Sequence, residues 1–73
     1  MKLFVGKNCM PCKMLKQWLV DNKIEIPQLI AEDNMQEAQA AGVKALPTLV
    51  LDDGSTLQGF DNIKEYFAGE EDE

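Results

Sequence analysis

The sequence predicts a single α/β domain with the element order β-α-β-α-β-β-α. Three observations carry this prediction. The length of 73 residues suits one compact core and is too short for two. Short apolar runs alternate with stretches of helical periodicity. No internal repeat or linker separates them, and the apolar fraction of 45% is ordinary for a globular chain.

The first strand and helix follow from the first 22 residues. Lys2–Val5 is a short apolar run that ends at a glycine, which is typical of a strand. A helix is predicted from about Pro11 to Asn22, and Pro11 suits its first turn because the missing N–H costs nothing there. Apolar residues recur in this helix at i, i+1, i+4 and i+5 and predict its core face: Met14, Leu15, Trp18 and Leu19.

The middle of the chain predicts an interrupted strand and a short helix. Residues 24–26 alternate in polarity and residues 28–31 are mostly apolar, so together they predict a second strand. Pro27 interrupts its hydrogen-bond ladder or marks a sheet edge. The Asp33-Asn34 pair can cap a helix over residues 35–41, which a glycine then ends.

The last third predicts a hairpin and a third helix. Residues 48–51 and 56–58 read as strands, and the turn between them is Asp52-Asp53-Gly54. Asp-Gly supplies the positive φ values that a tight hairpin turn needs. Asp61 can then cap a last helix that contains Ile63, Tyr66 and Phe67.

The net charge of −6 is unevenly distributed. The first 20 residues carry four lysines and no acid, whereas the rest carries three lysines and all 13 acids. Four of these acids are the last four residues, so we predict a domain over residues 1–69 and an acidic disordered tail over 70–73. The basic segment is also the one that holds both cysteines.

The composition excludes several classes of function. The absence of histidine excludes a Ser–His–Asp triad, a Cys–His pair and an imidazole metal site. The absence of arginine excludes a bidentate phosphate clamp. The acidic balance argues against nucleic-acid binding, and no apolar run approaches the roughly 20 residues that span a membrane. The first apolar run is also too short for a signal peptide, so we expect a cytoplasmic protein.

The motif that carries chemistry is Cys9-Met10-Pro11-Cys12, where a strand ends and a helix begins. The spacing puts Cys9 at the helix N-terminus and Cys12 one turn inside on the same face, close enough for a disulfide. The helix dipole, Lys7 and Lys13 all favour a negative sulfur, so we predict a lowered pKa for Cys9. Cys9 is then the nucleophile and Cys12 the resolving thiol.

A structural role, a metal site and chance spacing stay open as alternatives for the cysteine pair. A structural disulfide that closes so short a loop stabilises the folded state by only about 2 kcal/mol, so it would contribute little as a structural cross-link. Zinc needs four ligands, so a metal site would require two chains to share their cysteine pairs. The alternative function is therefore a redox-sensing or metal-sharing binding module without turnover.

Two segments resemble the thioredoxin superfamily. Cys9–Cys12, with proline before the second cysteine and lysine after it, resembles the superfamily's active site. Residues 40–54 resemble thioredoxins in a Gly-Val, then a Pro-Thr, then an apolar strand and a turn. The resemblance implies a thioredoxin-like fold, in which three helices flank a mixed four-stranded sheet. It also implies that Pro47 is cis and faces the disulfide, and that the backbone of Leu46 pairs with a substrate strand.

The short chain and its element order look like a glutaredoxin. Gly59-Phe60-Asp61-Asn62-Ile63 is similar to the glutaredoxin segment whose backbone N–H groups hold the γ-glutamyl carboxylate of glutathione. The resemblance then implies that Lys7 holds the glycine carboxylate. Gly59-Phe60 also resembles the glutaredoxin-like redoxins that serve ribonucleotide reductase and are recharged by thioredoxin reductase. Met10 is a candidate apolar contact for protein partners.

We therefore expect an enzyme, a thiol–disulfide oxidoreductase that reduces protein disulfides through Cys9 and Cys12. We expect a monomer with no tightly bound cofactor and no metal. Ribonucleotide reductase is a candidate substrate, and thioredoxin reductase or glutathione is the candidate electron source. The candidate substrate-binding residues are Lys7, Met10, Pro11, Leu46, Pro47, Gly59, Phe60, Asp61 and Asn62.

Overall fold

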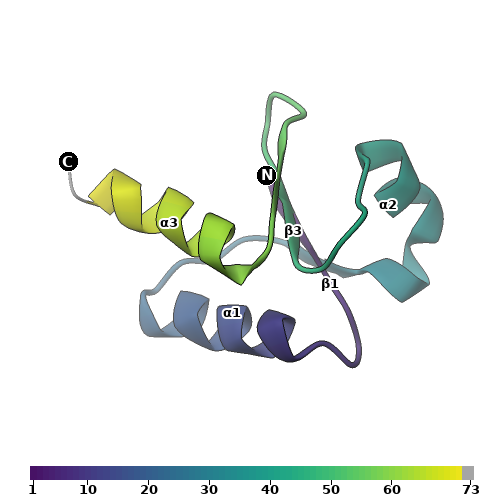
Figure 1. Ribbon diagram of the computed structural model, residues 1–73. Helices are drawn as coiled ribbons and strands as arrows, with labels where there is room; N and C mark the ends of the chain where they lie inside the picture. Colours follow the sequence, from purple (N-terminus) through teal and green to yellow (C-terminus); the bar gives the residue numbers. More distant parts are fainter. Residues whose placement is uncertain (72–73) are drawn as a thin grey trace.

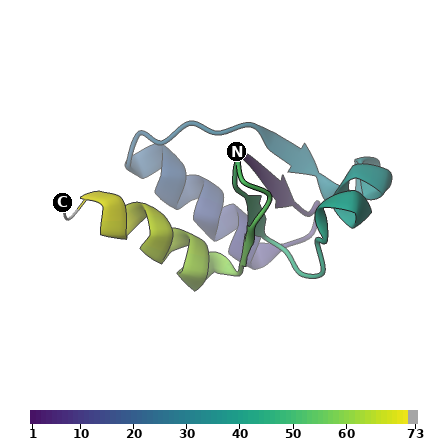
Figure 2. The same ribbon diagram turned by 90° about the horizontal axis from the view of Figure 1, so that it is seen from above.

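A four-stranded mixed sheet separates two helices on one face from a third helix on the other (Figures 1 and 2). The computed structural model describes residues 1–71. The predicted α/β class and element order are confirmed. The elements are β1 (Lys2–Val5), α1 (Met10–Asp21), β2 (Gln28–Ile30), the 3-10 turn η1 (Ala31–Asp33), α2 (Met35–Ala41), β3 (Thr48–Val50), β4 (Thr56–Gln58) and α3 (Phe60–Glu71).

The strand order is β2-β1-β3-β4, which makes β1 a central strand. β1 pairs in parallel with β2, with Phe4 opposite Leu29, and α1 supplies the crossover that a parallel pair requires. It pairs antiparallel with β3, with Leu3 opposite Leu49. β3 and β4 form an antiparallel hairpin. The ends of β1 and β3 therefore lie side by side, which brings the loops that follow or precede them together.

Successive residues of β1 enter two different cores because side chains alternate across a strand. Leu3 and Val5 point toward α1 and α3, whereas Phe4 points toward α2. All three are essentially inaccessible to solvent. The larger core is formed by buried residues of the sheet, α1 and α3: Leu3, Val5, Cys12, Leu15, Leu19, Leu49, Ile63 and Phe67.

The first helix begins at Met10, one residue before the predicted start, and ends at Asp21. Pro11 lies in its first turn as predicted. The Asn22 side chain donates to the Trp18 carbonyl at 2.8 Å and closes the C-terminal end. The predicted core face was wrong at Met14, which is 54% exposed. The buried residues of α1 are Cys12, Leu15 and Leu19, which follow an i, i+3, i+7 spacing that leaves Met14 outside the buried face.

The predicted strand at residues 24–26 was wrong, and β2 contains only Gln28–Ile30. Lys23 has a left-handed φ of 58°, and the Ile24 N–H donates back to the Leu19 carbonyl at 2.9 Å. The Ile24 N–H is therefore bonded within the turn and is not available to pair with a neighbouring strand. Ile24 and Ile26 instead pack their side chains against the larger core.

The second helix has the predicted bounds but not the predicted cap. Asn34 stands at the N-cap position, yet its side chain donates to the Ile30 carbonyl at 2.9 Å and makes no capping bond. Gly42 ends the helix with a φ of 83°, and the Val43 N–H donates to the Ala38 carbonyl. This is the left-handed ending that favours glycine.

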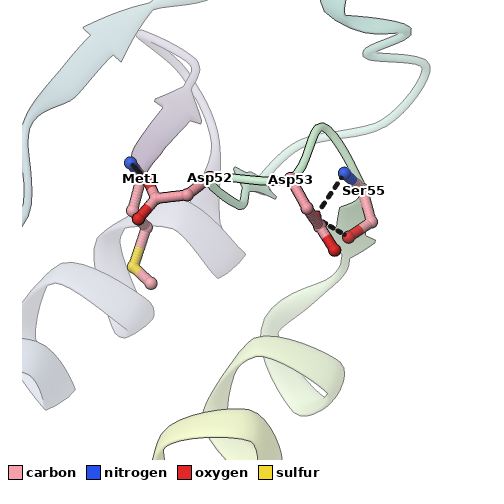
Figure 3. Close-up of polar contacts among 4 residues, drawn as sticks. All are labelled: Met1, Asp52, Asp53 and Ser55. Atoms are coloured by element: carbon pink, nitrogen blue, oxygen red, sulfur yellow. Dashed lines mark hydrogen bonds and ion pairs between the residues drawn. The ribbon is translucent and has the colours of Figure 1, made fainter.

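The predicted turn between β3 and β4 is confirmed at Asp52-Asp53-Gly54 (Figure 3), although β3 ends at Val50, one residue early. Gly54 adopts a φ of 91°, which glycine tolerates best. The Asp53 carboxylate accepts hydrogen bonds from the Ser55 hydroxyl and from its N–H at 2.9 Å, and these lower the pKa of Asp53. The Met1 amino group pairs with the neighbouring Asp52.

The third helix begins at Phe60, so Asp61 lies within its first turn and the predicted cap was wrong. The helix continues to Glu71, so the first two residues of the predicted disordered tail are helical. Residues 72–73, the rest of that tail, lie outside the described residues. Within the described part of the chain, each helix falls short of the length and apolar character needed to cross a membrane.

Candidate redox site

The two cysteines lie at the N-terminus of α1 and are joined in a disulfide, with their Cα atoms 5.2 Å apart. Cys9 is the N-cap residue, and its Sγ accepts the Cys12 N–H at 3.2 Å. Cys12 is only 1% exposed and belongs to the larger core, whereas Cys9 is partly exposed. Because of this difference in exposure, the Cys9 sulfur can contact a sulfur of another molecule, whereas the Cys12 sulfur is shielded from solvent.

The cis-proline loop precedes β3 and lies at the same end of the sheet. The Leu46–Pro47 peptide bond is cis, as the resemblance implied. Pro47 is fully buried, and its carbonyl accepts the Gly59 N–H at 2.9 Å. The Thr48 hydroxyl donates to the Ala45 carbonyl on the other side of the proline. These bonds attach the loop to both β3 and the start of α3.

Gly6 allows the cis-proline loop to approach the cysteines. A Cβ atom on Gly6 would lie 2.9 Å from Leu46 Cδ1 and 3.3 Å from Cys9 Cβ. Both separations are shorter than ordinary van der Waals contact, so a larger residue would push Leu46 or Cys9 away. This close approach at Gly6 was not predicted from the sequence, where the glycine signalled only the end of a strand.

A groove of about 550 Å³ lies between the start of α1, Leu46 and the start of α3. It brings together most of the predicted substrate-binding residues. Met14, predicted as core, is a further lining residue that was not predicted from the sequence. Met14 and Met10 are 54% and 67% exposed, and their i, i+4 spacing places them on one face of the helix. The lining is Pro11, Met14, Leu46, Gly59, Phe60, Asp61 and Asn62.

Three of the predicted substrate-binding residues do not line this groove. Pro47 is buried behind Leu46, and Met10 is exposed beside the groove. Lys7 pairs through its Nζ with Asp33 at 3.3 Å. Its backbone N–H also donates to Glu32 Oε2 at 3.4 Å.

The contacts of Lys7 include two acids that lie far from it in the sequence. Lys7 and Lys13 were expected to stabilise a Cys9 thiolate with no acid close in sequence. The fold brings Glu32 and Asp33 from η1 onto the loop that holds Lys7. The positive charge of Lys7 is therefore matched by a carboxylate, because β2 lies beside β1 and its end meets the same loop.

Among the residues whose side chains are described, 1–69, no three or more cysteines, aspartates and glutamates lie together in a way that could hold a metal ion.

The structure is similar to a solved thioredoxin. The crystal structure of the thioredoxin Mala s 13 from Malassezia sympodialis, described as a member of a pan-allergen family, matches with a TM-score of 0.69 and 27% sequence identity. The match covers 92% of this chain and 68% of that one. No protein-family model and no curated protein sequence matches the chain.

Proposed function

Since the chain is a redoxin of the thioredoxin superfamily with a disulfide-forming Cys-x-x-Cys pair, we propose that it reduces protein disulfides. One observation carries the proposal. The partly exposed Cys9 caps α1 beside the cis-proline loop and an apolar groove, with buried Cys12 directly behind it. The helix N-terminus favours the Cys9 thiolate, which is the attacking species in disulfide exchange.

The reaction runs in two exchange steps. The Cys9 thiolate attacks one sulfur of the substrate disulfide, whose S–S bond breaks, and the released substrate thiolate takes up a proton. Cys12 then loses its proton and attacks the Cys9 sulfur of the mixed disulfide, which releases the second substrate thiolate. Two electrons have passed from the dithiol to the substrate, and the product is the Cys9–Cys12 disulfide. An external dithiol or thiol reductant returns both electrons.

The groove supports a peptide substrate over glutathione. Its walls are largely apolar, with Met14, Leu46 and Phe60 available to contact a side chain next to the substrate disulfide. Glutathione would also need partners for its carboxylates. Lys7, the implied partner of the glycine carboxylate, already pairs with Asp33. We therefore propose thioredoxin reductase as the electron source and ribonucleotide reductase as a candidate substrate.

The first experiment measures reduction of a protein disulfide, insulin, by the full chain supplied with electrons by thioredoxin reductase and NADPH. Cys9→Ser should abolish turnover because it removes the attacking sulfur. Cys12→Ser should accumulate a mixed disulfide, which mass spectrometry detects, because the resolving thiol is missing. Full activity in the Cys9→Ser protein would contradict the proposal.

A second arm replaces thioredoxin reductase with glutathione and glutathione reductase. We expect a much lower rate with glutathione, and equal or faster turnover would overturn the preference for thioredoxin reductase. Zinc analysis of the purified protein accompanies both arms. Stoichiometric zinc without turnover would instead support the metal-sharing module.

A further inference from the structure

A carboxylate lies close to the redox pair but takes no part in the exchange steps. A Cβ atom on Gly6 would lie 3.8 Å from Glu32 Oε1 and 3.3 Å from Cys9 Cβ. Glu32 Oε1 and Cys9 Cβ are therefore within about 7 Å of each other. The other oxygen, Glu32 Oε2, accepts the Lys7 N–H at 3.4 Å. Glu32 is thereby held against the loop that leads into Cys9.

The carboxylate of Glu32 forms no ion pair with a lysine in the described part of the chain. Lys7 Nζ pairs with Asp33 instead, and Lys44 lines the same pocket as Glu32 without pairing with it. The loop before Cys9 therefore contacts two carboxylates and one ammonium group, whereas the sequence around Cys9 holds only lysines as charged residues.

We infer that Glu32 adjusts the redox centre through its charge, by disfavouring the Cys9 thiolate and so favouring release of electrons from the dithiol. The Cys9 Sγ lies one C–S bond beyond Cβ, so the charge is at most about 9 Å away, and at the dielectric constant of water it changes the acid dissociation constant of the thiol about two- to threefold. The dithiol is the form that ionises, so the carboxylate raises its free energy relative to the disulfide. Only the functional benefit of this effect rests on the proposed function, because a protein that reduces disulfides must release electrons from its dithiol.

Other charges surround the cysteines and stay constant in the test. Lys13 follows Cys12 in α1, Lys44 precedes the cis-proline loop, and Asp61 lines the groove. Lys7 and Asp33 form the ion pair already described. A substitution at Glu32 that keeps its shape therefore isolates one charge.

The test compares the reduced wild-type chain with Glu32→Gln by following the ultraviolet absorbance of the thiolate during a pH titration. The glutamine oxygen can still accept the Lys7 N–H, but the negative charge is gone. We expect the pKa of Cys9 to fall, with its acid dissociation constant rising about two- to threefold at low salt and less at high salt. In equilibrium with a glutathione redox buffer, at a pH where Cys9 is ionised, Glu32→Gln should shift toward the dithiol by a similar factor.

Two further variants separate charge from structure. Glu37→Gln makes the same change in net charge, but its carboxylate pairs with Lys2 Nζ at 2.6 Å, near the far end of β1, and should titrate as wild type. Glu32→Asp retains the charge and should restore most of the wild-type titration. An unchanged pKa in Glu32→Gln, or an equal shift in Glu37→Gln, would overturn the inference. Because the titration reads the thiol directly, it is informative even if the protein reduces no disulfide.

Discussion

The two ends of the β1–β3 pair differ in what holds them together. At the cysteine end, contacts join distant parts of the chain, with Leu46 against Gly6 and the Pro47 carbonyl bonded to Gly59. At the opposite end, which carries the hairpin at the top of Figure 1, the main polar contacts of Asp53 are local and exposed. The cysteine end therefore depends on the whole fold, whereas the hairpin is specified largely by its own residues.

The largest effect in this comparison is expected from Gly6→Ala. The added Cβ would lie 2.9 Å from Leu46 Cδ1, the end of a flexible side chain that can turn away, and 3.3 Å from Cys9 Cβ, which must move by a few tenths of an ångström, so we expect a loss of about 1 kcal/mol, the low end for overpacking. Disulfide reduction should also slow, because Leu46 lines the groove and Cys9 carries the attacking sulfur. Urea unfolding and insulin reduction measure the two effects.

Gly69→Ala is the matched control for that change. Gly69 lies in α3 with no atom within 4 Å of an added Cβ, so alanine should leave activity unchanged. It should stabilise the helix by about 0.5–1 kcal/mol. If Gly6→Ala is as stable and active as wild type, the close approach of the two loops is not required.

A smaller effect is expected from Met14→Ala, which tests the groove. Met14 is 54% exposed, so its loss should change the free energy of unfolding by no more than about 0.5 kcal/mol. Removing its apolar contact with a peptide should raise the KM for a protein disulfide several-fold, since each buried methylene contributes about 0.8 kcal/mol. Steady-state kinetics with insulin measure this change.

Val20→Ala is the control for Met14→Ala. Val20 lies on the same helix and is 69% exposed, but it is outside the groove. It should leave KM unchanged. Equal KM values for Met14→Ala and wild type would show that substrates bind elsewhere.

The smallest effect is expected at the hairpin. Hydrogen bonds from Ser55 lower the pKa of Asp53 in the folded protein, so this group contributes stability above the ordinary carboxyl pKa. The contribution is lost as the pH falls through the lowered folded pKa. Asp53→Asn should therefore be less stable than wild type at neutral pH, and the difference should shrink in acid.

Urea unfolding at several pH values checks this prediction, with Ser55→Ala expected to behave in the same way. Disulfide reduction at neutral pH should stay at the wild-type level in both variants, because the turn follows the end of β3 that pairs with the start of β1, whereas Cys9 follows the other end of β1. A pH-independent difference would contradict the role of the Asp53 hydrogen bonds.

Much of the fold could be predicted because it rests on local patterns. The Asp52-Asp53-Gly54 turn, the ending of α2 at Gly42 and the position of Pro11 each depend on the conformational preferences of one or two residues. Residues 24–26 were mispredicted because an alternating pattern indicates burial on one side. It does not reveal that a turn at Lys23 has already used the backbone hydrogen bond.

By itself, the sequence determined the element order and the position of the cysteine pair at a helix N-terminus, since periodicity and turn chemistry act over a few residues. The tertiary structure decided which distant groups surround that pair. It brought Leu46 to Gly6 and the acids of η1 to Lys7, and it exposed Met14 in the groove. These contacts depend on strand order and on how the helices pack on the sheet. The ion-pair partner of Lys7 therefore followed from the fold rather than from its neighbours in sequence.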